Sequence, residues 1–193
     1  MSEIKSALEL ALERTADVKS DKSLIEANET KKVGMKLAGR LIDSPDVDAR
    51  GEINKLDKEK RQWAREGFIS VLISHISLPT QETDLQRLRA VTKGLEAVAR
   101  DGNAVVTVME QVEQLLRQYL DNKNQLVESL RQQFEPRLRQ QEQEIAQQTG
   151  TRVKLDAASD PEFAKALSQN MQRLQAQYNQ VIEQARDQLK SYL

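Results

Sequence analysis

The feature that most constrains the fold is an apolar stripe that recurs with an 11-residue period in two separate segments. Steps of four, four and three residues keep such a stripe on one face of an α-helix, whereas a β-strand would need a period of two. In the first segment the stripe is formed by Val108, Val112, Leu116, Tyr119, Lys123, Val127, Leu130, Phe134, Leu138, Gln141 and Ile145. In the second it is formed by Phe163, Leu167, Met171, Leu174, Tyr178, Ile182, Ala185, Leu189 and Leu193.

Two helical arms with the same period predict a long antiparallel hairpin in an all-α protein. Its expected seam residues are Leu116, Leu130, Phe134, Leu138, Ile145, Phe163, Leu167, Met171, Leu174, Tyr178, Ile182 and Leu189. The expected pairs are Phe163 with Ile145, Leu174 with Phe134, and Tyr178 with Leu130. Lys123 then lies opposite the small Ala185, where its stem can cross the seam while its ammonium group reaches water.

The first arm contains two features that disfavour helix. Arg100-Asp101-Gly102-Asn103 resembles a helix stop, whose asparagine could cap a following helix. The helical spacing nevertheless continues through it, so we expect a continuous or bent helix, with a break as the alternative. Pro136 removes a backbone donor, which costs about 3 kcal/mol in a helix interior. Because Phe134 and Leu138 stay in phase around it, we expect a kink there rather than a break.

Residues 1–100 are expected to form an N-terminal helical bundle. Amphipathic helices are predicted at 3–18 and 23–42, and Asp21 or Ser23 can cap the second of them.

A more apolar helix is predicted at residues 56–78. Its large side chains cover nearly all of its faces, so neighbouring helices must surround it. Pro79 marks its end, and Thr83 with Gln86 resembles a capping box for the next helix.

The hairpin is assigned to residues 101–193, with a tip at 149–160. Within the tip, residues 151–155 alternate apolar and basic side chains, and this period of two predicts a short strand. A lone strand needs a partner for its backbone groups. The expected partner-binding residues are therefore Arg152, Val153, Lys154 and Leu155. The alternative is that the two apolar residues among them close the hairpin end against Ile145 and Phe163.

The sequence Ser159-Asp160-Pro161-Glu162 predicts the start of the second arm. Asp160 can be the N-cap with Pro161 in the first helical position, or Ser159 can cap while Glu162 completes a capping box.

Charge and composition restrict the classes of function. The chain has 29 Lys and Arg against 30 Asp and Glu, a net charge of −1, and the two signs are interspersed. Nucleic-acid binding relies on clustered cations, so a dedicated nucleic-acid-binding protein is disfavoured. There is no cysteine, which removes disulfides, thiolate metal sites and cysteine nucleophiles. We find no signal peptide and no run of about 18 apolar residues, so we expect a cytoplasmic protein without membrane insertion.

Other candidate sites have simpler interpretations. His75 is the only histidine and lies on an apolar helix, so we expect a core or interface residue. Trp63 has basic neighbours but is expected to pack in the core. Acidic groups that could bind a metal ion are expected to be solvated; they are Asp43, Asp46 and Asp48, and Glu142 with Glu144. We expect no catalytic residue, no metal and no cofactor.

The opening sequence MSEIKSALELALERT resembles the start of a family of uncharacterised bacterial helical proteins. The resemblance covers this helix and the segment from Gly34 to Leu41. It implies a bacterial origin and supplies no mechanism.

These patterns predict a non-enzymatic helical adaptor, scaffold or stalk that binds a protein partner or itself, and a homo-oligomer is expected. The alternative from another class is an RNA- or ribosome-associated factor that binds through the N-terminal bundle.

Overall fold

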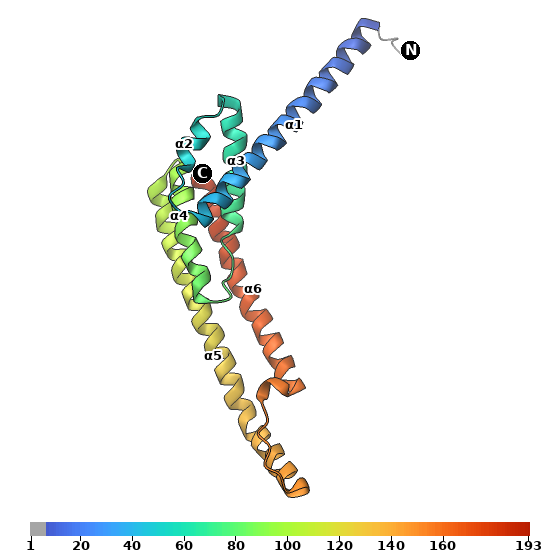
Figure 1. Cartoon of the computed structure of the whole chain (residues 1–193), viewed down its shortest axis with the longest axis vertical. Coiled ribbons are helices and arrows are strands. Elements are labelled where there is room, and N and C mark those ends of the chain that lie inside the picture. The colour runs from blue at the N-terminus through green and yellow to red at the C-terminus, as the bar shows by residue number, and fades with distance from the viewer. Residues whose placement is uncertain (1–6) are drawn as a thin grey trace. The chain divides into compact units, whose positions relative to one another are not determined.

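The computed structural model describes the backbone of residues 7–193 and the side chains from residue 22 onward. Its elements, in chain order, are α1 (Ala7–Asp43), α2 (Ala49–Asn54), α3 (Lys58–Ser74), the 3-10 helix η1 (Glu82–Leu85), α4 (Gln86–Val98), α5 (Gly102–Thr149), the 3-10 helix η2 (Ala157–Ser159) and α6 (Pro161–Tyr192) (Figure 1). This part of the chain contains no β-strand, so the predicted all-α class is confirmed. None of its helices combines the length and apolar content that a membrane crossing requires.

The chain divides into two compact units, and each is described by itself. The first contains the residues up to His75 together with Arg89–Val105 and Tyr192–Leu193. The second contains Ile76–Leu88 and Val106–Ser191, and therefore most of α5 and α6.

Helix α1 replaces the two helices predicted at 3–18 and 23–42. Residues 3–6 of the first prediction lie outside the described residues. The break was wrongly predicted because Asp21 and Ser23 were taken as caps. In a helix interior each of these residue types costs only about 0.5 kcal/mol relative to alanine, and no glycine or proline separates the two segments.

Two glycines allow α1 and α3 of the first unit to cross at close range. A Cβ atom at Gly34 would lie closer than 3.0 Å to the carbonyl oxygen of Ala64, and one at Gly67 equally close to that of Lys31. Real Cβ atoms do not show such distances, so only hydrogen fits at either position. Ion pairs flank the crossing: Lys31 to Glu66 at 2.9 Å and Lys60 to Glu26 at 2.8 Å. Hydrogen bonds from these lysines lower the pKa values of both glutamates.

Helix α3 is shorter than the predicted helix at 56–78. It ends at Ser74, where the His75 N–H donates to the carbonyl groups of Val71 and Leu72. The prediction extended too far because Ile76 is fully buried although it lies beyond the helix. The predicted helix therefore counted a buried loop residue as part of the helical pattern.

The start of α4 also differs from the prediction. The capping box is made by Gln81 and Asp84 of η1 rather than by Thr83 and Gln86. The Asp84 carboxylate accepts from the backbone N–H groups of Thr80 and Gln81 at 2.8 and 3.2 Å, and the first of these bonds is the main cause of its lowered pKa.

Helix continuity through Gly102 was predicted wrongly. Helix α4 ends at Val98 and α5 begins at Gly102. Asp101 supplies the cap, because its carboxylate accepts from the Ala104 N–H at 3.0 Å. The aspartate thus stabilises a new helix start that apolar spacing alone did not indicate.

Pro136, in contrast, lies inside the unbroken helix α5, as predicted. Its side chain is exposed, so the carbonyl group that loses its helical partner faces water rather than a packed core.

Helices α5 and α6 run antiparallel within the second unit (Figure 1). Every predicted seam residue is buried or half-buried. Phe134 packs edge-on against Phe163 with ring centroids 5.5 Å apart. Tyr119 packs in the same way against Tyr178 at 5.3 Å, and Asn122 donates to the Tyr178 hydroxyl at 2.7 Å.

These contacts show that the predicted register was wrong by one repeat. The prediction paired Phe134 with Leu174, whereas its observed partner Phe163 lies 11 residues earlier in the chain. A shift of 11 residues brings stripe onto stripe again, so periodicity cannot distinguish the two registers. The shift arises because residues 151–160 run back along α5 before α6 begins.

Two cations of the hairpin hold the loop that precedes η1. Lys123 Nζ donates to the carbonyl oxygen of Thr80 at 2.9 Å, and Arg186 Nε to that of Ile76 at 3.1 Å. Lys123 therefore binds a backbone carbonyl of the same unit instead of crossing the seam over Ala185, which was the expectation.

The glycine crossing predicts opposite effects for two alanine substitutions in α1. Gly34→Ala should lower the free energy of unfolding by about 2 kcal/mol, because the new methyl group clashes with the α3 backbone. Gly39→Ala meets no atom within 4 Å and should raise it by about 0.5–1 kcal/mol. Urea unfolding followed by circular dichroism measures both. Equal effects of the two substitutions would refute the close crossing.

The register predicts which cysteine pairs cross-link. The chain has no native cysteine. Phe134→Cys with Phe163→Cys should form an intramolecular cross-link under mild oxidation. Phe134→Cys with Leu174→Cys should not, because 11 helical residues separate the two α6 positions by roughly 16 Å. Electrophoresis without reductant reads out both pairs, and the reverse result would restore the predicted register.

Candidate functional site at the hairpin tip

The tip begins with a glycine-dependent turn. Helix α5 ends at Thr149, and Gly150 follows with a φ of +70°, a conformation that L side chains rarely adopt. The Gly150 N–H donates to the Ala146 carbonyl at 2.9 Å, and the Thr149 hydroxyl donates to that of Ile145 at 2.8 Å. These bonds satisfy the end of the helix and direct the chain back.

Residues 151–156 form neither helix nor strand, so the predicted strand is wrong. Among the described residues, the backbone N–H groups of Arg152, Val153 and Lys154 donate no hydrogen bond. Side-chain alternation suggested a strand, but the chain brings no second strand alongside to bond with it. Three consecutive backbone donors therefore remain open to solvent.

Leu155 anchors this segment to α5. Its N–H donates to the Glu142 carboxylate at 2.6 Å, and its side chain is half-buried. Val153 remains 43% exposed. The alternative in which both apolar residues close the hairpin end is therefore wrong for Val153.

Asp160 fixes the start of the return helix. Its carboxylate accepts from the N–H groups of Glu162 at 2.8 Å and Phe163 at 3.4 Å, which makes it the N-cap, with Pro161 first in the helix as predicted. Arg137 of α5 lies 3.9 Å from the Asp160 carboxylate and pairs with Glu162. The hydrogen bond to Glu162 raises the pKa of Arg137.

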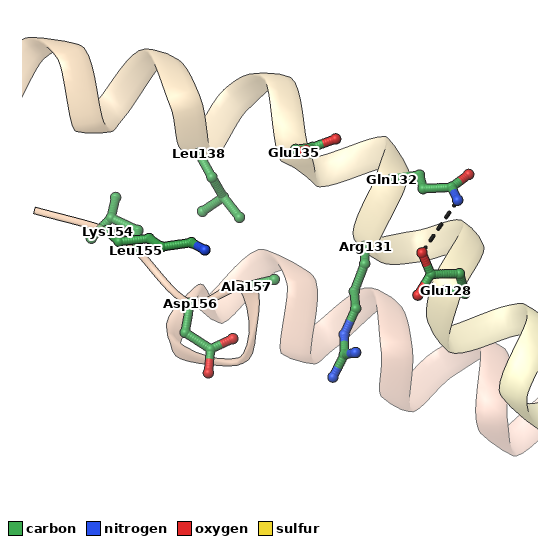
Figure 2. Close-up of a pocket in the computed structure, with 9 residues that line it drawn as sticks. All are labelled: Glu128, Arg131, Gln132, Glu135, Leu138, Lys154, Leu155, Asp156 and Ala157. Atoms are coloured by element: carbon green, nitrogen blue, oxygen red, sulfur yellow. Dashed lines mark hydrogen bonds between the residues drawn. The ribbon is translucent and has the colours of Figure 1, made fainter.

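An open hollow of about 570 Å³ lies between α5 and the tip segment (Figure 2). Helix α5 contributes Glu128, Arg131, Gln132, Glu135 and Leu138. The tip contributes Lys154, Leu155, Asp156 and Ala157. Figure 2 shows Leu138 pointing toward the tip segment and Arg131 projecting from the same side of the helix. The hollow thus combines a small apolar surface with charged groups of both signs.

The predicted tip residues divide between two positions. Lys154 and Leu155 line the hollow, whereas Arg152 and Val153 are exposed and do not. The α5 residues of the hollow were missed. They flank the apolar stripe at helical spacing, but the predicted register gave no reason to place the tip segment beside them.

The remaining candidates have local structural roles. His75 is exposed, not in the core, and its Nδ1 lies 2.9 Å from the Val71 carbonyl oxygen. Asp48 caps α2 by accepting from the Gly51 N–H at 2.9 Å. Trp63 is half-buried. In residues 7–193 no three His, Asp or Glu side chains converge as a metal site would need.

Comparison with known proteins identifies a family. The model of a family of unknown function (DUF6657) matches residues 50–191, which is most of the chain. This match covers the hairpin and the tip, whereas the resemblance noted above lies at the N-terminal end. No curated protein and no solved structure matches the chain.

The anchoring of the tip segment can be tested by hydrogen exchange. Glu142→Ala removes the acceptor of the Leu155 N–H and should speed exchange of that amide roughly tenfold or more, since a hydrogen bond to a charged group contributes about 1.5–3 kcal/mol. Glu144→Ala is the control, because Glu144 only accepts from exposed Gln140, at 3.0 Å. Exchange at Leu155 that is equally fast in both variants and in the unchanged protein would contradict the anchor.

Proposed function

The chain belongs to this family of unknown function, and we propose that it is a cytoplasmic, non-enzymatic helical adaptor or scaffold that binds a protein partner at its hairpin tip. The observation that carries the proposal is the open backbone of residues 152–154 on an otherwise helical arm. An extended segment with free N–H groups can pair with the backbone of a bound peptide, and its side chains then provide specificity.

The surroundings of the segment support this role. The tip segment is held at one end by the Gly150 turn and at the other by the Leu155 bond to Glu142. A segment that is already ordered loses less conformational entropy when it binds. Val153 adds an exposed apolar side chain between two cations, a combination suited to a mixed apolar and polar contact.

The proposal includes self-association as one form of partner binding. The apolar side chains of Val153 and, on α6, Val181 are each 43% exposed. Leu120, which the sequence also offered as open apolar surface, is instead buried. A second copy of the chain is therefore among the partners that the test below must identify.

The RNA-binding alternative receives less support from the first unit. Lys31 and Lys60 form ion pairs with Glu66 and Glu26, which reduces the positive charge available to phosphates. The same experiment separates the two functions by their response to salt and nuclease.

A single substitution at the tip tests the proposal. Val153→Asp should reduce capture of the partner from native lysate at least about tenfold, while the melting temperature stays nearly unchanged, because exposed positions usually alter stability by less than about 0.5 kcal/mol. Val181→Asp is the matched control, since both valines are 43% exposed. Captured proteins are identified by mass spectrometry.

Three controls complete the design. Light scattering on the purified chain shows whether the partner is a second copy. Nuclease treatment and a salt series identify RNA, whose binding falls steeply with salt. The proposal is wrong if Val153→Asp and Val181→Asp give the same capture profile, or if nuclease abolishes capture.

A further inference from the structure

The charged groups around the hollow are not equally engaged. Its acids already accept hydrogen bonds: Glu128 from Gln132 at 3.3 Å, Glu135 from Arg139 at 2.6 Å and Asp156 from the Ala158 N–H at 3.0 Å. Glu142, beside the tip segment, accepts from the Leu155 N–H. Each neighbouring carboxylate is thus committed to a donor of the same chain.

The cations of the same region are free. Arg131, Arg152 and Lys154 are exposed, and none of them forms an ion pair or hydrogen bond through its side chain within the described residues. Lys154 and Arg131 both line the hollow, and Figure 2 shows the Lys154 side chain extending below Leu138. The hollow therefore offers positive charge and backbone donors, although the whole chain has a net charge of −1.

We propose that the hollow and the adjoining backbone of residues 152–154 bind an extended acidic segment of a protein partner. Carboxylates of that segment pair with Arg131 and Lys154, and its carbonyl groups accept from the open N–H groups. Such charge complementarity guides encounter and fixes the orientation of a bound chain. This inference rests on the proposed function, because it names the chemistry of the partner at the same tip.

A peptide fits these groups better than a nucleic acid does. The hollow holds only two free cations, and the carboxylates of Glu128 and Glu135 lie beside them. Tight phosphate binding requires many clustered cations, and neighbouring carboxylates repel a phosphate backbone. Leu138 and Leu155 provide an apolar surface for alternate side chains of an extended peptide.

Fluorescence anisotropy with defined peptides tests the inference. The probe is a labelled peptide of alternating glutamate and valine, measured at about 0.1 M salt, where the screening length is about 10 Å. It should bind the full chain at least about tenfold more tightly than a peptide of alternating lysine and valine. Arg131→Glu with Lys154→Glu should remove this preference.

A control and a charge exchange make the test specific. Lys165→Glu with Arg173→Glu changes two exposed cations of α6 that lie outside the hollow, and should leave acidic-peptide binding within about twofold. The variant with two glutamates in the hollow should instead prefer the lysine peptide. Equal binding of both peptides by the unchanged protein, or tighter binding of a single-stranded oligonucleotide than of the acidic peptide, would overturn the inference.

The outcome can be separated from that of the proposed function. Capture from lysate that is lost in Val153→Asp but kept in the variant with Arg131→Glu and Lys154→Glu supports the tip as a partner site and refutes the acidic partner. Capture that is lost in both, with the acidic peptide bound as expected, supports the two together.

Discussion

The pairing of two 11-residue stripes is the interaction on which the tip depends. Periodicity alone accepts two registers, one repeat apart, because both bring apolar positions face to face. The observed register is marked by two edge-on aromatic pairs and by the Asn122 bond to the Tyr178 hydroxyl. Aromatic pairs contribute about 0.5–1.5 kcal/mol each beyond their buried area, and such a hydrogen bond about 1 kcal/mol. These specific contacts distinguish one register where general apolarity does not.

The register also determines how the tip is built. When Phe163 packs against Phe134, the chain between Gly150 and Asp160 must run back beside α5. That course brings the Leu155 N–H to Glu142 and places Lys154 near Arg131. One repeat further along, the same residues would form only a turn. The hollow is therefore a product of helix pairing as much as of the tip sequence.

The sequence predicted the parts of the fold that depend on local chemistry. Apolar spacing identified both arms of the hairpin, and Asp160 before Pro161 located the start of α6. The helix break before Gly102 was missed because a single capping carboxylate, that of Asp101, outweighed a continuous apolar pattern.

Predictions at the site were less complete, since it is formed by residues far apart in the chain. Lys154 and Leu155 were identified from their own segment. Arg131 and Glu128 could be placed beside them only with the correct register, which periodicity leaves open. The exposed position of His75 was likewise not visible in the sequence, because it depends on where α3 ends.

The glycine crossing of α1 and α3 has a consequence for the range of sequences that this pair of helices can accept. At Gly34 and Gly67 the requirement is one of volume, and only a hydrogen atom meets it. Around them, at positions such as Ala38 and Phe68, the requirement is hydropathy and approximate size, which several residue types satisfy. The backbone atoms themselves form the contact, so the distance between the helices is fixed by two residues while their neighbours are free to change.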